Sequence, residues 1–305
     1  MAVPMRSTDF RSVVEPILNE VFDGIYEQRA DEWKGIAKER VGTPRAYHEE
    51  PMLYGFGAAP ELPDGMPVTY QSGGVLYIQR YPYRVYGLAF ALTKVLVEDG
   101  DHIRIGSIYS EHLAQAMIET KETLVANVFN RGFNNSFPGG DGVAMNSNAH
   151  PVIGGTQSNI LTTAAALSQT SVEQMLIQIR SAEDANGKKI RLQPAKLIVP
   201  PSLMFQAEVI LKSVLRTGGA NNDINPVKSM GLLSEGAKVI SRLTSPTAWW
   251  IQNGNVARGV QMMKRRSLQK SMEGDFETDS MRYKATERYW PSFTDWRDNY
   301  GTPGL

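Results

Sequence analysis

The stretch SIYSEHLAQAMIETKETLVANVFNR, residues 107–131, is the longest helical pattern in the sequence. One face of this pattern is lined by apolar residues at helical spacing: Leu113, Met117, Leu124 and Val128. Charged residues occupy the opposite face, and Gly132 follows directly. At roughly 1.5 Å per residue, the pattern predicts an amphipathic rod about 36 Å long.

The composition around this rod is that of a packed globular protein. The chain has 305 residues, of which 42% are hydrophobic and 21% charged, enough for about two domains or one large irregular one. Lys and Arg together number 32, as do Asp and Glu, so the formal net charge is zero. A protein whose main task is to grip nucleic-acid phosphates needs a basic excess, whereas a protein that only encloses DNA does not.

Secretion and membrane insertion are not indicated by the sequence. Cysteine is absent, which excludes disulfides, thiolate catalysis and cysteine-ligated metal centres. The N-terminus has no apolar core behind a basic start, and no window approaches the ~18 apolar residues of a membrane span. We expect no membrane partner, and a protein made in a cytoplasm-like compartment or in something assembled there.

Towards the N-terminus, residues 8–40 have the pattern of a helix. Its apolar stripe consists of Val13, Val14, Ile17, Leu18, Val21, Phe22 and Ile25. Residues 41–67 then lose all periodicity and contain Pro44, Pro51, Pro60, Pro63 and Pro67. Since such a helix has little of its own chain to pack against, we expect an arm that lies over a neighbouring molecule.

A hairpin is predicted between this arm and the rod, in VTYQSGGVLYIQRYPYRVYG, residues 68–87. Apolar and polar residues alternate on both sides of Gly73-Gly74, which supplies a two-residue turn. Pro82 hinders continuation of the second limb as a central strand. Because a lone hairpin is marginal in water, this protruding arm also requires a partner surface.

After the rod comes FPGGDGVAMNSNAHPVIGGTQSN, residues 137–159, which is rich in chemically capable side chains. Asp141, Ser147 and His150 are the residue types of a catalytic triad. However, Ser147 lies on no strand-to-helix elbow, and a flexible loop lacks the rigidity that preorganisation needs. Gly154-Gly155-Thr156 is not followed by the Gly-Lys-Ser/Thr of a phosphate loop. An ordered connection between domains is the favoured interpretation, and a Ser/His hydrolase stays open as the alternative.

The C-terminal half alternates between helices and strands. Ser171 and Gln174 form a capping-box pattern at the start of one helix. KLIVPP, residues 196–201, predicts a buried strand whose prolines lead into a helix that carries Leu203 to Val214. AKVISRL, residues 237–243, is a further strand candidate.

Two more strands are predicted towards the C-terminus. Asn253-Gly254 predicts a type I′ turn that joins TAWWIQ, residues 247–252, to VARGVQMM, residues 256–263. Because successive side chains of a strand point to opposite faces, one of the adjacent residues Trp249 and Trp250 should face inward and the other outward. MRYKATERYW, residues 281–290, alternates as a half-buried strand. Its outer face is basic and carries Arg282, Lys284 and Arg288.

No convincing catalytic, cofactor-binding or metal-ligating residue is found, and no cofactor is expected. The histidines His48, His102, His112 and His150 lack metal-ligand spacing. Lys264-Arg265-Arg266 is a local basic run of the kind usually found on solvated edges. The chain therefore combines an ordinary core with an arm, a hairpin and a rod that need partners, which is typical of an assembly subunit.

The order of these parts resembles the major capsid proteins of tailed bacteriophages with the HK97-type fold, particularly the Mu-like head subunits. The resemblance is carried by four stretches and extends from about residue 70 to the end: DGVAMNSNAHPVIGGTQSN (141–159), DANGKKIRLQPAKLIVPPSLMFQAEVILKS (184–213), NNDINPVKSMG (221–231) and FETDSMRYKATERYWPSFTDWRDNYGTPG (276–304). No single stretch is diagnostic, and their order is the specific feature.

The resemblance implies an α+β, HK97-like fold in which each segment has a role. The implied segments are an N-terminal arm (1–50), an extended loop (51–87), a peripheral domain (88–159) with a spine helix (107–131), an axial domain (160–265), and a return strand with the C-terminal tail (266–305). It also implies self-assembly into pentamers and hexamers of an icosahedral virion shell, formed in the bacterial cytoplasm around double-stranded DNA. Scaffolding or protease, portal and decoration proteins are implied partners.

Two departures from the family refine these expectations. The sequence starts directly with the arm, so a scaffolding segment would have been removed or be a separate protein. Residues 51–87 contain no lysine, so the lysine–asparagine crosslink of some members is not expected. Three alternatives stay open: an encapsulin-like compartment shell, a tail or connector ring, and the Ser147/His150 hydrolase. DNA contact through Arg282, Lys284 and Arg288 would be weak and unspecific.

Overall fold

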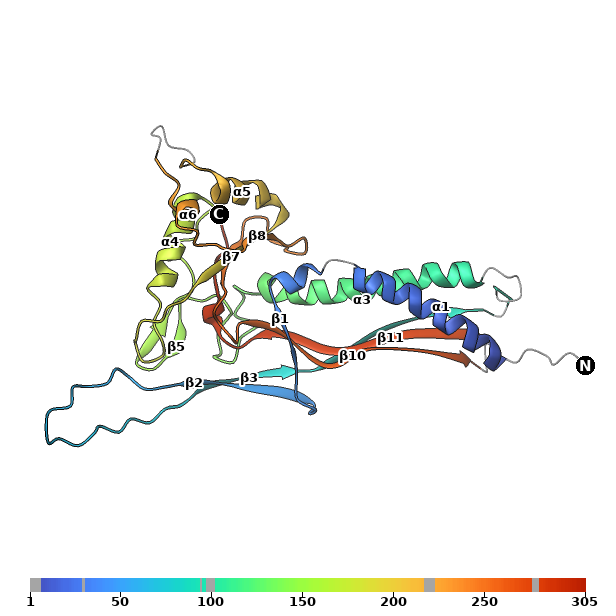
Figure 1. Cartoon of the computed structure of the whole chain (residues 1–305), viewed down its shortest axis with the longest axis horizontal. Helices are drawn as coiled ribbons and strands as arrows, with labels where there is room; N and C mark the ends of the chain where they lie inside the picture. The colour runs from blue at the N-terminus through green and yellow to red at the C-terminus, as the bar shows by residue number, and fades with distance from the viewer. Residues whose placement is uncertain (1–6, 29–30, 94, 97–101, 217–222, 276–279) are drawn as a thin grey trace, which may run out of the picture.

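The computed structural model of the chain describes residues 7–28, 31–93, 95–96, 102–216, 223–275 and 280–305. It is an elongated molecule with three parts (Figure 1): a long domain, a compact domain at one end of it, and a hairpin that projects past the compact domain. None of the described helices is both long and apolar enough to cross a bilayer.

The long domain packs two helices on one face of a four-stranded sheet. The helices are α1 (Ser7–Gln28) and α3 (His102–Asn130). The strands, in the order β1-β10-β11-β4, are β1 (Lys38–Val41), β10 (Val260–Asp275), β11 (Ser280–Phe293) and β4 (Arg84–Leu92). The predicted rod is confirmed as α3 and begins five residues earlier than its sequence pattern. The alternation of β11 is confirmed, since Tyr283, Ala285 and Tyr289 are buried beneath the helices.

The expectation of a helix over residues 8–40 is wrong for the last ten residues. Helix α1 ends at Gln28, a 3₁₀ turn follows at Glu32–Gly35, and β1 then joins β10 in parallel. Within the described chain, Val14, Leu18 and Phe22 are fully buried, in a cluster with residues of α3, β10 and β11. The helix therefore buries these three apolar side chains against its own chain.

The hairpin is present, but its first limb is not the predicted one. Strand β2 (Tyr47–Tyr54) pairs with β3 (Gly74–Pro82), and residues 55–73 form the loop that closes it. The predicted limb at 68–72 is not a strand, and Gly73-Gly74 is not its turn. The reason is pairing: β3 takes as its partner a strand about twenty residues further back, and Pro51 is tolerated there because a two-stranded ribbon consists only of edges.

The compact domain contains a second sheet, in the order β12-β9-β7-β8. Its strands are β7 (Pro194–Val199), β8 (Gly236–Val239), β9 (Trp249–Asn253) and β12 (Asn299–Thr302). Its helices are α4 (Gln169–Arg180), α5 (Met204–Lys212) and the short α6 (Pro226–Ser229), with a 3₁₀ turn at Pro201–Leu203. The predicted strand KLIV and the proline-led helix after it are thus confirmed.

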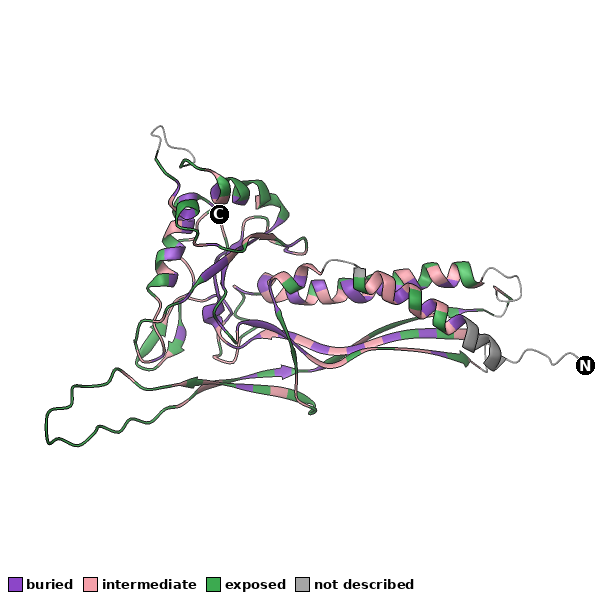
Figure 2. Cartoon of the chain, viewed as in Figure 1, coloured by how far each residue is buried: buried purple, intermediate pink, exposed green. Residues whose placement is uncertain are grey.

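The two adjacent tryptophans are both buried, contrary to the expectation that one faces outward. Trp249 packs in the core under α4 and α5, whereas Trp250 packs with Phe129 of α3 in the core at the domain junction. Both faces of β9 are covered because this sheet lies between two layers. Figure 2 shows the resulting buried band through the junction.

Two local predictions in this half need correction. The cap of α4 is Ser168, which forms a capping box with Ser171, so the helix begins one turn before the predicted start. Asn253-Gly254 is not a type I′ turn, because that turn needs positive φ and Gly254 is not among the glycines with positive φ. Strand β9 pairs with β7 and β12, whereas β10 belongs to the other sheet.

Candidate functional site

The loop after α3 folds into the junction between the domains, where its polar side chains form one buried cluster. It includes the short strands β5 (His150–Val152) and β6 (Gly155–Gln157). His150 is fully buried, with Nδ1 2.6 Å from Asp141 Oδ2 and Nε2 3.1 Å from Asn159 Oδ1. The imidazole also stacks on the Trp296 indole, with ring centroids 4.1 Å apart.

Asn159 fixes the orientation of this cluster. Its Nδ2 donates to the carbonyl oxygens of Met145, at 2.7 Å, and Asn299, at 2.8 Å. Its Oδ1 accepts the backbone N–H of Ser147 at 2.8 Å, which identifies this atom as the amide oxygen. Because an amide oxygen cannot donate, His150 Nε2 must be the donor in the hydrogen bond between them. His150 therefore has no free lone pair on Nε2 with which to act as a general base.

Ser147 is not part of a catalytic triad. Its Oγ accepts the backbone N–H of Ala149 at 3.2 Å in a local turn, while the third partner of the Asp141–His150 pair is Asn159. The sequence analysis grouped Asp141 with His150 correctly. It chose Ser147 as the third member, whereas the third member is Asn159. The hydrolase hypothesis fails on this geometry, because the cluster contains a base-like histidine without a nucleophile.

The segment Thr294–Asn299 completes the junction with buried charged groups. Asp298 Oδ2 accepts hydrogen bonds from Gln252 Nε2 at 2.7 Å and from the Val260 backbone N–H at 3.1 Å. Burial raises the pKa of Asp298 to about 6 and also raises the pKa of Asp295 above its ordinary range. These groups link β9 of the compact domain to β10 of the long domain, so their role is to hold the two sheets together.

The base of the hairpin is anchored in the same region, a feature that sequence reasoning missed. Thr294 Oγ1 donates to the buried Glu50 carboxylate at 2.6 Å and lies 2.5 Å from Tyr81 Oη. Gln261 Nε2 donates to Tyr81 Oη at 2.7 Å, and Tyr77 Oη donates to the Thr294 carbonyl at 2.8 Å. No local pattern could reveal this anchor, since its hydrogen bonds join residues at least 180 positions apart.

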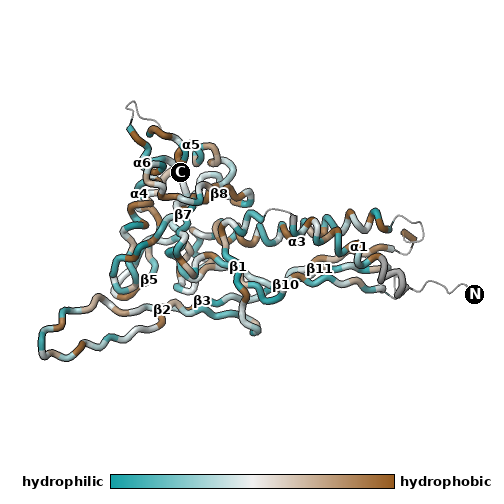
Figure 3. Tube along the Cα trace, viewed as in Figure 1, coloured by the Kyte–Doolittle hydropathy of each residue, from teal (hydrophilic) through white to brown (hydrophobic). Residues whose placement is uncertain are grey.

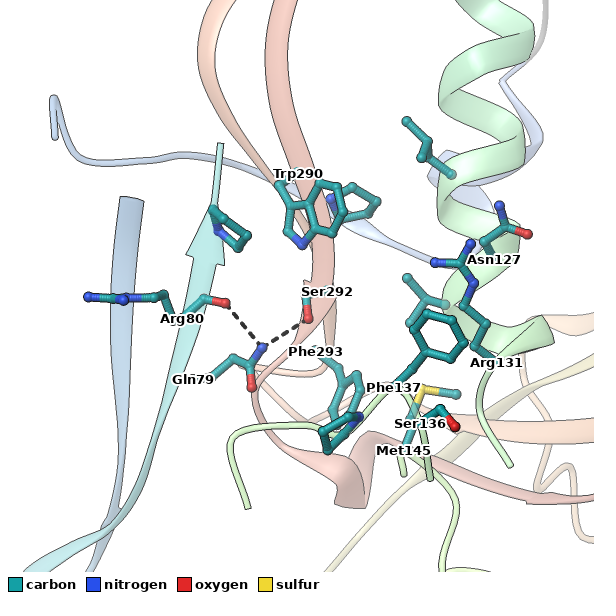
Figure 4. Close-up of a pocket in the computed structure, with 15 residues that line it drawn as sticks. Gln79, Arg80, Asn127, Arg131, Ser136, Phe137, Met145, Trp290, Ser292 and Phe293 are labelled. Atoms are coloured by element: carbon teal, nitrogen blue, oxygen red, sulfur yellow. Dashed lines mark hydrogen bonds between the residues drawn. The ribbon is translucent and has the colours of Figure 1, made fainter. Parts of the chain in front are cut away.

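A cavity of about 330 Å³ lies between the hairpin base, the end of α3 and β11 (Figure 4). Gln79 Nε2 donates to Ser292 Oγ at 3.1 Å along one wall, and Arg131 lies over the Phe137 ring on the other. The lining residues combine arginine, amide, hydroxyl and apolar side chains, without a carboxylate or histidine. This cavity therefore has no acid–base or metal-binding set.

The remaining candidates from the sequence are dispersed. His48 lies on β2, His102 and His112 lie on α3, and His150 is committed to the junction. Over the described residues no cluster of His, Asp and Glu could hold a metal ion. Gly154 makes the turn between β5 and β6 with φ +82°, so Gly154-Gly155-Thr156 is a hairpin turn.

The basic run lies on β10 and is next to the basic strand β11 in the sheet of the long domain. Lys264 pairs with Glu39, and Arg265 donates to the carbonyl oxygen of Pro44 at 2.8 Å. Arg266 lies opposite Arg288 across β10 and β11 and donates to Thr286 Oγ1 at 3.2 Å. On β11, Arg282 pairs with Asp275, whereas Lys284 is exposed.

Exposed apolar side chains concentrate in the loop that closes the hairpin. Figure 3 shows hydrophobic stretches along this loop, far from either core. Five of its large apolar side chains are more than half exposed: Phe56, Leu62, Met66, Val68 and Tyr70, the last at 95%. The compact domain adds Ile177 on α4 and Phe205 on α5. Such an amount of projecting apolar surface is typical of a subunit that is completed by contacts with other copies.

Comparisons with known proteins agree with this interpretation. Residues 83–298 match the protein family described as "Phage capsid protein". A sequence comparison with curated proteins gives no significant match.

Solved structures share the fold at low sequence identity. The capsid of cyanophage P-SCSP1u aligns with a TM-score of 0.54 and 12% identity, over 86% of this chain and 84% of that one. Mycobacterium phage Patience gives a TM-score of 0.54 and 11% identity, over 99% and 92% of the two chains. A virus-like particle from Pyrococcus furiosus gives a TM-score of 0.51 and 11% identity, over 94% and 98%.

The fold is thus the HK97-like fold of phage major capsid proteins, and the predicted α+β class is confirmed. With a family match over more than two thirds of the chain, the protein belongs to the phage capsid protein family and is a structural, non-enzymatic subunit of a virion capsid shell.

Proposed function

We propose that copies of this chain close into an icosahedral shell of pentamers and hexamers around double-stranded phage DNA. One observation carries the proposal: a hairpin anchored at its base by Glu50, Tyr81 and Thr294 holds an apolar loop beyond the body of its own molecule. At roughly 3.3 Å per residue the hairpin reaches about 60 Å. A projection of this length suits a contact with the next subunit.

The parts of the chain take the roles that the family resemblance implies. In this proposal the long domain is the peripheral domain, with α3 as its spine helix, and the compact domain is the axial domain that clusters around the five- and six-fold centres. The segment 1–50 is the arm, although β1 and the first half of β2 lie within it. The positive-φ glycines Gly142 and Gly154 lie in the segment between α3 and α4 that joins the two domains, where small changes of angle between quasi-equivalent copies can be absorbed.

The shell is held together without covalent links between subunits in this proposal. The extended loop at 51–87 has no lysine for an isopeptide crosslink, and the chain has no cysteine. Strength then depends on each subunit contacting several others, since one standard interface buries about 1,600 Å².

The finer identity and the partners are part of the same proposal. We assign the chain to the Mu-like head subunits on the four stretches that carry the resemblance. Assembly takes place in the bacterial cytoplasm with a scaffolding or protease component and a portal, and decoration proteins can bind the finished shell. The near-zero net charge suits many copies packed side by side.

Electron microscopy of negatively stained, purified assemblies tests the proposal directly. We expect closed polyhedral particles, which contain nuclease-protected DNA when they are isolated from phage-producing cells. Open rings would indicate a tail or connector protein. Closed particles that contain protein cargo and no DNA would indicate a compartment shell.

A further inference from the structure

We propose that two copies of the chain join through strand β4, whose free edge pairs antiparallel with the same strand of a neighbouring copy. The two four-stranded sheets then become one continuous sheet. The free edge is the side of residues 84–92 that faces away from β11. The inference deepens the proposed function and rests on it, because it names a two-fold contact between copies within the shell.

Only one side of β4 is paired within the described chain. On that side all nine residues of the strand pair with β11, from Arg84 opposite Tyr289 to Leu92 opposite Met281, without a register shift. On the other side no described strand lies beside it, since β4 ends the order β1-β10-β11-β4. The outward N–H and C=O groups make no backbone hydrogen bond to any other described segment either. An unpaired edge of this length is a template for pairing with another chain.

The free edge of β4 lacks the features that normally prevent such pairing. Natural edge strands carry charges, prolines or bulges, or are very short. Residues 85–92, VYGLAFAL, contain no charged residue and no proline, and their pairing with β11 has no bulge.

The other edge of the same sheet is protected. Strand β1 covers β10 only as far as Lys264. The part of β10 beyond that residue is charged and carries Arg265, Arg266, Lys270, Glu273 and Asp275. One edge of the sheet therefore repels an added strand, and the other edge is open to one.

Apolar side chains along the open edge are only partly covered. Tyr86 and Phe90 pack into the cores beneath the helices, where the ring centroids of Phe90 and Tyr109 of α3 are 5.7 Å apart. Leu88 lies between them on the same side of the strand, yet it is 52% exposed. On the opposite side, Val85 is 57% exposed. A second strand at the ~4.8 Å spacing of a sheet would cover both side chains.

The strand that best fits this edge is a second copy of β4. Charged side chains placed against Val85 and Leu88 would lose water without gaining a partner, so the incoming strand has to be uncharged there. The other described strands with a free edge are charged, short or proline-containing: β1, β2, β3, β5, β6, β8, β10 and β12. In a capsid shell, other copies of the chain are also the partners present in the largest number.

The pairing we propose is centred on Leu88, which then lies opposite the same residue of the other copy. Arg84 of each copy lies opposite Leu92 of the other, so the two arginines are roughly 26 Å apart. At this separation their repulsion is screened at physiological salt. The contact uses the same surface on both copies and has a two-fold axis, which matches the two-fold axes of a closed icosahedral shell.

Opposite charges at position 88 test the self-pairing. Leu88→Lys and Leu88→Asp should each lower the yield of sedimenting shells about tenfold or more, because like charges then lie directly opposite each other. Co-expression of the two variants should restore most of the yield, since lysine can then face aspartate. Only a contact of the residue with its own counterpart gives this recovery.

Leu88→Thr is the matched control, because threonine keeps the strand propensity and adds no charge. It should assemble in near-normal yield. Circular dichroism and melting temperature of the unassembled subunits check that the charged variants fold, as expected for a half-exposed position. Normal yield of either charged variant alone, or no recovery on co-expression of folded variants, would overturn the proposal.

A single cysteine provides a test that does not depend on charge. The chain has no cysteine of its own, so Leu88→Cys introduces one thiol per copy. Mild oxidation of assembled shells should give covalent dimers and no larger species on a non-reducing gel. Val85→Cys is the control and should stay monomeric, because its two thiols would be roughly 20 Å apart, beyond the reach of a disulfide.

The outcome also separates this contact from the capsid function. Leu88→Cys shells of normal appearance that yield no dimer would overturn the inference and leave the function intact. Failure of the unmodified chain to form shells would contradict the function itself. If both charged variants fail, co-expression does not rescue them and Leu88→Cys gives no dimer, a different segment covers the edge and the self-pairing is wrong.

Discussion

At the scale of single residues, the junction cluster illustrates how a catalytic-looking set can be structural. Asp141 and His150 pair as they would in a hydrolase, but Asn159 and Trp296 occupy the positions around the imidazole. The sequence makes the Asp–His pairing conceivable because the two residues are close in the chain. It cannot reveal Trp296, which comes from a distant segment.

Replacing His150 with Ala should destabilise the protein by about 3 kcal/mol, because a buried Asp141 carboxylate would lose its partner. Ser147→Ala should cost less than about 1 kcal/mol, since Ser147 makes one local hydrogen bond. Urea unfolding of the unassembled subunit measures both values. Equal losses for the two variants would show that Ser147 shares the role of His150.

Asp298 should make stability depend on pH in a direction unusual for a carboxyl group. Its pKa is raised to about 6 in the folded protein, so its folded form binds a proton more tightly than the unfolded chain. Its stabilising contribution, up to about 3 kcal/mol, is therefore complete below pH ~4 and is lost as the pH rises through ~6. Asp298→Asn should reduce this dependence in unfolding curves recorded from pH 4 to 7. An unchanged pH profile in the variant would contradict the assignment.

At the scale of elements, those with a strong local pattern were predicted and those defined by pairing were not. Helix α3 and strands β7 and β11 follow directly from apolar periodicity. The first limb of the hairpin was misplaced because the partner of β3 is chosen by contacts around Glu50 and Tyr81 that no local pattern contains. The helix at 8–40 was overextended: its apolar stripe ends at Ile25, and Trp33 and Ile36 beyond it are buried in the junction core.

Two glycine substitutions should distinguish the effect of helix propensity on stability from the effect of the space available for a side chain. Gly24 lies inside α1, and a Cβ there would meet no atom within 4 Å, so Gly24→Ala should stabilise the protein by about 0.5–1 kcal/mol. Gly259→Ala should destabilise it by more than about 2 kcal/mol, since the new Cβ would lie 2.0 Å from Asp298 Oδ2. Thermal unfolding measures both. A gain at Gly259 would mean that the junction can relax around an added methyl group.

At the scale of the whole molecule, the fold separates a self-sufficient body from a projecting contact element. The arm helix was expected to need a neighbour and is instead covered by α3, β10 and β11. The hairpin is the opposite case, because its base is fixed and its tip is exposed. Residues 55–73 at the hairpin tip are therefore available for assembly, whereas the strands on either side of them belong to the folded body.

Shortening the hairpin should abolish assembly without unfolding the subunit. Replacing residues 56–72 with Asn-Gly leaves Gly55 and Gly73 to close β2 and β3 with a tight turn. We expect an unchanged circular dichroism spectrum and melting temperature, with sedimentation as a small oligomer or monomer. Particles of normal size from this variant would show that the hairpin tip is dispensable for the shell.

The lack of basic residues in the projecting hairpin also affects the resistance of the unassembled subunit to proteolysis. Between Arg45 and Arg80 the chain offers no lysine or arginine, so proteases of trypsin-like specificity find no bond to cut in its most accessible part. Limited trypsin digestion of unassembled subunits should leave this stretch as one fragment, whereas chymotrypsin should cut at Phe56 or Tyr70. If finished particles resist chymotrypsin, the loss of cleavage during assembly would measure the rate at which the hairpin tips become covered.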